Sequence, residues 1–266
     1  VDYYQPAGTA PPGPDPDQYL VGLAGARRAT TKTALLSRNF LFELPVDIRA
    51  DQYFYVRLES SMDVSAAINV WSALELRQHD LHYYASFGLI YGILLSMILY
   101  NLFIFIALKD RTYLYYVLYV ISSLFWLLWV HGHSVLIFGR FPDLDFRLLW
   151  AFIGSLLLWA PLFARSFLSS ARTMPGLAKI ILFMAGLGGV VILAGLSGYI
   201  QAAFWLSHFC GLALPIVLIL AALVRLRQGF KAAKYFVLAW AALIVGGIAF
   251  ALMGLKILPV SFITSN

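Results

Sequence analysis

The sequence contains few charged residues: Asp, Glu, Lys and Arg together make up 12% of its 266 residues. A soluble globular domain carries about 25%. So little charge argues against a disordered chain, a coiled coil or a cytosolic enzyme, because each of these needs polar surface to stay in water. Cysteine is scarce as well. Cys210 is the only one, so the chain has no disulfide framework of its own.

What the sequence has instead is apolar side chains, which make up 61% of it. Five long stretches lack Asp, Glu, Lys and Arg, and a spanning helix needs about 20 apolar residues. The stretch 180–224 is too long for one helix, and the small residues of 195–201 mark a break in it. The sequence therefore predicts a membrane bundle of six helices. They are expected near 84–107, 112–134, 147–167, 179–197, 202–224 and 235–256.

The positive charges indicate how these helices are oriented. If residues 1–80 lie outside the cytoplasm, the inner loops carry nine Lys and Arg and the later outer segments carry three. Basic residues collect in cytoplasmic loops, so this orientation is favoured. Because the basic residues lie in short clusters without interleaved stacking aromatics, we expect no nucleic-acid partner.

Residues 1–80 have a different texture, with seven basic and ten acidic residues. After the proline-rich segment 5–18, apolar and polar side chains alternate in 39–44, 53–59 and 64–71. This alternation predicts antiparallel strands of an extracytoplasmic β-sandwich. Because two or three strands cannot bury a face alone, we expect that the domain begins upstream of Val1. The predicted domains are 1–80, the C-terminal part of the sandwich, and 81–266, the helical part.

Four segments of the helical part resemble the bacterial seven-transmembrane receptors with diverse intracellular signalling modules. They are YGILLSMILYNLF at 91–103, KDRTYLYYVL at 109–118, AKYFVLAW at 233–240 and LPVSF at 258–262. The resemblance implies a periplasmic jelly-roll domain, seven helices and a cytoplasmic output module. A seventh helix and an output module are therefore expected after Asn266. In that family the output modules include diguanylate cyclases, histidine kinases and phosphatases.

Four histidines fall near the predicted outer membrane face: His79 and His82 before the first helix, and His131 and His133 at the end of the second. Imidazole is a common metal ligand, and the two segments should be neighbours in an antiparallel pair. The alternative is that they are interfacial polar residues beside tyrosines. A ligand or metal site at these four residues remains a hypothesis, because their spacing matches no zinc signature.

Asn101, Gln201 and His208 lie at or near membrane depth. Polar groups there face other helices or water, since lipid cannot satisfy them. Contact between helices is the favoured interpretation, and a ligand pocket or ion path is the alternative.

Gly195-Leu-Ser-Gly198 matches the GxSG motif around a rhomboid protease serine, with His208 on the next helix. The alternative is a tight turn of small residues, and no HxxxN motif accompanies it. We therefore predict that Ser197 is not a nucleophile, and we expect no catalytic residue and no cofactor in this chain.

The favoured function is that of a sensory receptor region in the bacterial inner membrane, with its N-terminal domain in the periplasm. The alternative is a transporter or channel, which the lack of charged residues deep in the predicted spans argues against. The expected partners are a small molecule or carbohydrate outside, membrane lipids, a cytoplasmic output domain and a second copy of the chain. The link 71–84 contains no Gly or Pro. We predict that it couples the two domains stiffly.

Overall fold

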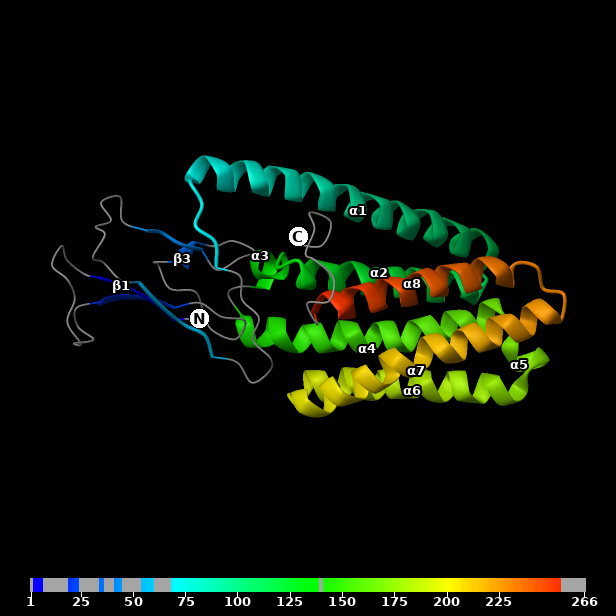
Figure 1. Ribbon diagram of the computed structural model, residues 1–266. Helices are drawn as coiled ribbons and strands as arrows, with labels where there is room; N and C mark the ends of the chain where they lie inside the picture. Colours follow the sequence, from blue (N-terminus) through cyan, green and yellow to red (C-terminus); the bar gives the residue numbers. More distant parts are fainter. Residues whose placement is uncertain are drawn as a thin grey trace. The chain divides into compact units, whose positions relative to one another are not determined.

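The computed structural model describes residues 2–6, 19–23, 34–35, 41–44, 54–59, 68–138 and 141–254. The chain divides into two compact units. Residues 1–70 and 126–149 form one, called the strand unit below, and residues 71–125 and 150–266 form the other, called the helical unit (Figure 1).

The strand unit contains two small antiparallel sheets. β1 (Asp2–Pro6) lies between β2 (Tyr19–Leu23) and β5 (Tyr55–Arg57), and β3 (Ala34–Leu35) pairs with β4 (Leu41–Phe42). Tyr3 is opposite Gly22 and Val56 in the sheet. Its ring stacks on Phe42 of the other sheet, with ring centroids 4.8 Å apart. This contact joins the two sheets, and burial raises the pKa of the Tyr3 phenol above its usual value.

The predicted strands are confirmed in part. β4 lies within 39–44 and β5 within 53–59. The prediction of a strand at 64–71 is wrong over its described part, because 68–71 are not in a strand. Ile68 and Val70 are 67% and 78% exposed, so their alternation does not bury a face. Of the proline-rich segment 5–18, Gln5 and Pro6 belong to β1, and the rest lies outside the described residues.

Eight helices follow in the described part of the chain. They are α1 (Ala73–Leu108), α2 (Arg111–Val130), α3 (Ser134–Phe138), α4 (Pro142–Phe167), α5 (Ser170–Thr173), α6 (Pro175–Leu196), α7 (Ile200–Arg227) and α8 (Ala233–Gly254). All six predicted helices are present. By length and composition, however, the described residues give five membrane spans rather than six: α1, α2, α4, α6 and α7. The apolar part of α8 counted within the described residues, Ala233–Gly246, is shorter than a span.

Helix α1 begins eleven residues before the predicted position. The Ser72 hydroxyl accepts a hydrogen bond from the Glu75 backbone N–H, and the Glu75 carboxylate accepts one from the Ser72 backbone N–H. This capping box satisfies two backbone donors at the helix start. The prediction was too short because charged residues exclude a membrane span, whereas a helix can continue through them into water.

Helices α1 and α2 pack as an antiparallel hairpin within the helical unit. The centre of their contact is formed by Ile98 on α1 and by Val117 and Val120 on α2. All three side chains are less than 9% exposed. Thr112 on α2 also shares a hydrogen bond with Ser166 on α4, with the two hydroxyl oxygens 2.6 Å apart.

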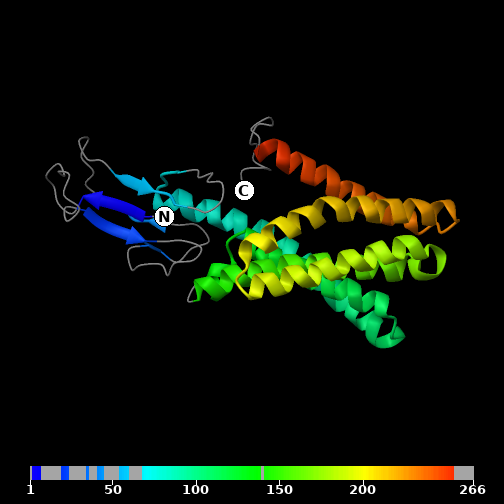
Figure 2. The same cartoon turned by 90° about the horizontal axis from the view of Figure 1, so that it is seen from below.

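The other helices of this unit pack through small residues. Gly154 on α4 faces Gly188 on α6, and a Cβ on Gly188 would lie 2.5 Å from the Leu158 backbone nitrogen. Gly195 on α6 packs in the same way on Trp150. Helix α7 lies beside α6 in both views (Figures 1 and 2). Glycine at these positions lets the α4 and α6 backbones approach closely, as is common between membrane helices.

Candidate functional site

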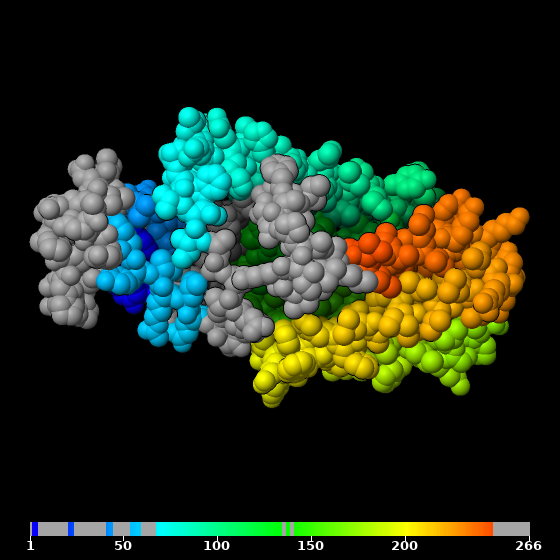
Figure 3. All heavy atoms as spheres, viewed as in Figure 1, coloured from blue at the N-terminus to red at the C-terminus, as the bar shows by residue number. Residues whose placement is uncertain are grey.

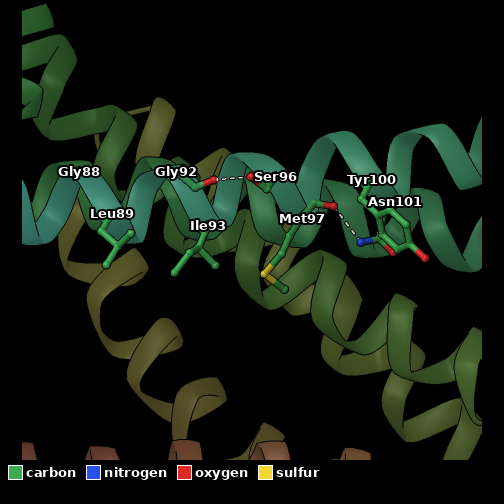
Figure 4. A pocket seen from close by; sticks show the side chains of 8 residues that line it. All are labelled: Gly88, Leu89, Gly92, Ile93, Ser96, Met97, Tyr100 and Asn101. Atoms are coloured by element: carbon green, nitrogen blue, oxygen red, sulfur yellow. Dashed lines mark hydrogen bonds between the residues drawn. The ribbon is translucent and has the colours of Figure 1, made fainter.

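A groove runs along one face of α1, in its apolar part (Figure 4). It has a volume of about 600 Å³ and is formed by one helix alone. Gly88, Gly92 and Ser96 follow each other at intervals of four, so they lie on one stripe of the helix. No atom lies within 4 Å of a Cβ placed on either glycine. The remaining lining residues are Leu89, Ile93, Met97, Tyr100 and Asn101.

Asn101 is the one predicted polar residue that lines this groove. Its side-chain Nδ2 donates to the Met97 carbonyl at 2.8 Å, and the Ser96 hydroxyl donates to the Gly92 carbonyl at the same distance (Figure 4). Both bonds stay within α1. Each side chain therefore makes a hydrogen bond within its own helix, which lowers the cost of placing it on an apolar face.

Gln201 and His208 lie on α7, and both are exposed. The His208 Nδ1 is 2.8 Å from the Phe204 carbonyl, and its ring packs on Phe204 with centroids 4.1 Å apart. Ser197 is exposed and caps the end of α6, where its backbone N–H donates to Leu193. Ser197 and His208 both lie in the described part of the chain, and no hydrogen bond joins their side chains there.

The four outer histidines are divided between the two units. In the helical unit, His79 packs on Trp71 and lies 3.8 Å from the Asp80 carboxylate, and His82 Nδ1 is 2.8 Å from the Gln78 carbonyl. In the strand unit, the His131 and His133 rings lie 6.5 Å apart. Within the described residues, no three His, Cys, Asp or Glu side chains come together as a metal site would require.

A polar cluster at the end of α2 was missed by the sequence analysis. Gly132 ends α2 with a φ of 74°, and the His133 backbone N–H donates back to the Leu128 carbonyl. This C-terminal motif, which favours glycine, places His133 and Ser134 in buried positions. The Ser134 hydroxyl donates to the carboxylate of Asp145 at 3.2 Å.

Asp145 is 6% exposed, and the Trp129 indole lies beside its carboxylate. A buried carboxylate is uncommon and is tolerated only with hydrogen-bond donors around it. The sequence contains one signal for the burial of Asp145, which is its spacing of two residues from Asp143. Two residues apart on a helix, they point in nearly opposite directions, and Asp143 bonds the exposed Arg147 at 2.9 Å. Asp145 must therefore point the other way.

One of the comparisons with known proteins found a match, and it lies in residues 81–266, the predicted helical part. The family model described as 7TM diverse intracellular signalling matches residues 83–266. No curated protein and no solved structure matches the chain.

Proposed function

From the chain's membership in the 7TM diverse intracellular signalling family, we infer that it is the sensing part of a multi-pass membrane receptor. The outer strand domain, a jelly-roll-like sandwich in this proposal, binds a small molecule or carbohydrate. The helices pass the change to a cytoplasmic output module that belongs to the rest of the protein. The membrane is the inner membrane of a bacterium, with residues 1–80 in the periplasm.

The observation that carries this proposal is the continuity of α1. The helix begins at Ala73, three residues after Val70, where the strand unit's N-terminal segment ends. It then runs without a break to Leu108. A continuous helix transmits a tilt or a shift along its length, whereas a flexible linker absorbs it. Movement of the strand domain therefore reaches the far end of α1 directly, as a two-state change that a ligand can bias.

The test measures movement at one end of α1 when the other end is disturbed. The chain carries Lys109→Cys and Cys210→Ala and is reconstituted in nanodiscs. An environment-sensitive fluorophore is attached to the cysteine introduced at position 109. A nanobody raised against residues 1–70 serves as the outer disturbance. We expect its binding to change the fluorescence. Inserting Gly-Ser-Gly-Ser after His79 should leave nanobody binding intact and abolish the change.

Two results contradict the proposal. If the nanobody binds and the fluorescence does not change in the parent chain, α1 relays nothing. If the insertion leaves the fluorescence change intact, the signal reaches the other end by another route. An insertion of the same length in the α7–α8 connection, after Lys231, is the matched control, and it should leave the response unchanged.

A further inference from the structure

The connections from α1 to α2, from α4 to α6 and from α7 to α8 lie at one end of the helical unit (Figures 1 and 2). Nine Lys and Arg residues lie in these connections or in the helix ends beside them, with Asp110 as the single acidic residue. The α7–α8 connection (orange) forms the outer surface there in Figure 3. Within the described residues, no ion pair joins any of the nine to an acidic side chain. They are Lys109, Arg111, Arg165, Arg172, Lys179, Arg225, Arg227, Lys231 and Lys234.

Two of the nine differ from the others in their surroundings. Arg165 and Arg225 are partly buried, whereas the other seven are exposed. The Nε atoms of both arginines are buried and donate no hydrogen bond to any described residue. A buried guanidinium N–H without an acceptor is costly, so each of these groups requires a partner.

Both arginines lie on the inner faces of their helices. Arg225 follows Leu218 by seven residues, which is nearly two full turns, and Leu218 is fully buried. Arg165 follows Pro161 by four residues, and Pro161 is among the most buried side chains. The two guanidinium groups therefore continue the buried faces of α7 and α4 beyond their apolar parts, where a positive charge is least well hydrated.

The end of α7 holds Arg225 in a fixed position. Gly229, with a φ of 90°, ends the helix, and the Phe230 backbone N–H donates to the Arg225 carbonyl. This turn brings the Phe230 ring to 4.8 Å from the guanidinium carbon. Arg225 Nη1 also donates to the Gln228 amide oxygen at 3.1 Å. Phe230 in turn packs on Phe167, the last residue of α4, with ring centroids 5.8 Å apart, so the ends of α7 and α4 meet here.

No described residue neutralises these two charges. Asp110 is the only acidic residue of the cluster, and one of its carboxylate oxygens accepts the Thr112 backbone N–H at 2.8 Å. Buried charges in proteins are paired, and a guanidinium matches a phosphate through two parallel hydrogen bonds. We propose that Arg165 and Arg225 bind the phosphate of an anionic phospholipid headgroup at this end of the helices.

The membrane surface is the source that best fits this position. Both arginines stand in the last turns of helices that are long and apolar enough to span a membrane, where headgroups are expected. Basic pockets between membrane helices bind lipid headgroups in this way. Helix α7 also offers apolar surface along which acyl chains can lie. Its exposed apolar side chains include Leu212, Ile216, Leu220 and Leu223.

The test begins with the parent chain in detergent without any lipid. Native mass spectrometry then detects the lipids that bind to it. Phosphatidylglycerol and phosphatidylcholine are added separately, and the fraction of chains retaining one lipid gives each affinity. We expect a clear preference for phosphatidylglycerol at one lipid per chain. Inorganic phosphate and glycerol 3-phosphate, added as competitors at the same concentration, should displace little of it, because they lack acyl chains.

Two double variants then separate a site from general attraction, because each removes two positive charges. In Arg165→Gln/Arg225→Gln we expect phosphatidylglycerol affinity to fall by about a hundredfold, because two charge-assisted hydrogen bonds are lost. In Lys231→Gln/Lys234→Gln both side chains are exposed, and we expect a fall of less than about tenfold. Arg225→Lys keeps the charge but loses the planar guanidinium that forms two parallel hydrogen bonds. Its fall in phosphatidylglycerol affinity should lie between those of the two double variants.

Several outcomes would overturn the proposal. An equal fall in the two double variants shows diffuse electrostatic attraction instead of a site. Effective competition by free phosphate assigns the site to a soluble anion, and displacement by a polyglutamate peptide assigns it to an acidic protein segment. If the arginine double variant does not fold, the parent measurements still decide, since absence of a phosphatidylglycerol preference refutes the lipid site.

Discussion

Helix α1 and the group formed by α4, α6 and α7 are all apolar enough to span a membrane but pack in different ways. In the most apolar part of α1, 6% of the residues are buried, against 39% in α4 and 33% in α6 and in α7. The glycines show the same contrast, because a Cβ would meet nothing at Gly88 or Gly92 and would meet backbone atoms at Gly154 and Gly188. Hydrophobicity places a helix in the membrane, and small residues at contacts decide whether it is held there rigidly.

The largest effect that we predict is that of Gly188→Ala. The added Cβ would lie 2.5 and 2.6 Å from backbone atoms of Leu158 and Leu157, so α4 and α6 must separate. We expect the free energy of unfolding to fall by about 1–3 kcal/mol, as for other overpacked sites. Unfolding in detergent, followed by tryptophan fluorescence, measures it.

The neighbouring residue provides the control for this substitution. Nothing lies within 4 Å of a Cβ on Gly189. Gly189→Ala should therefore not lower the free energy of unfolding by more than about 0.5 kcal/mol, and the higher helix propensity of Ala acts against even that loss. Equal losses in the two variants would mean that α4 and α6 are not in close contact, and the contrast with α1 would disappear.

The next effect concerns the start of α1, whose first residues, 73–75, are exposed and are capped by Ser72. Ser72→Ala removes the acceptor of the Glu75 backbone N–H and should destabilise the first turn by about 1 kcal/mol. Hydrogen exchange at the Glu75 and Leu76 amides should become about fivefold faster, because a loss of about 1 kcal/mol raises the open fraction of the first turn about fivefold. Ser72→Asp can still cap the helix and should restore protection. Unchanged exchange in Ser72→Ala would place the start of the stable helix further along the chain.

A smaller effect is expected from Thr112→Val, which breaks the hydrogen bond between α2 and α4. Hydrogen bonds between membrane helices contribute about 0.6 kcal/mol on average. A double-mutant cycle with Ser166→Ala should return this coupling energy. Ser123→Ala is the matched control, because the Ser123 hydroxyl donates to the Tyr119 carbonyl of its own helix. A coupling of zero would show that the α1–α2 hairpin is held to α4 by apolar contacts alone.

The smallest effect is expected from Gly92→Ala in the α1 groove. With open space around the new Cβ, the free energy of unfolding should change by no more than about 0.5 kcal/mol. The same unfolding experiment in lipid nanodiscs provides the sharper comparison. A loss as large as that of Gly188→Ala would show that another helix fills the groove in the membrane, and α1 would then resemble the tightly packed group.

The long apolar stretches were enough to predict six helices, because each covers many turns. Their ends were harder to predict, since α1 extends into water from Ala73 under the control of Ser72 and Glu75. The strand at 34–35 is two residues long, too short for alternation to identify it, whereas the alternation at 39–44 did predict the strand at 41–42. At 68–71 the alternation was present without a strand.

The candidate site residues show the same division between local and distant information. The position of Asn101 within a long apolar helix could be predicted from the sequence, because it follows from the apolar stretch around it. Its bond to the Met97 carbonyl is also local. The contact of Ser134 with Asp145 joins residues eleven positions apart, and the unpartnered Nε of Arg165 depends on how α4 packs. No pattern in one sequence contains that information.

The length of α1 gives it a mechanical property. Its 36 residues extend about 54 Å at 1.5 Å per residue, well beyond the hydrocarbon thickness of about 30 Å. Helix α1 contacts α2 near Ile98. Because Ile98 is 25 residues from Ala73 and ten from Leu108, the helix extends about 38 Å on one side of this contact and about 15 Å on the other. If α1 relays movement as we propose and turns about this contact, it is a lever with unequal arms, and a displacement of about 5 Å at Ala73 becomes about 2 Å at Leu108.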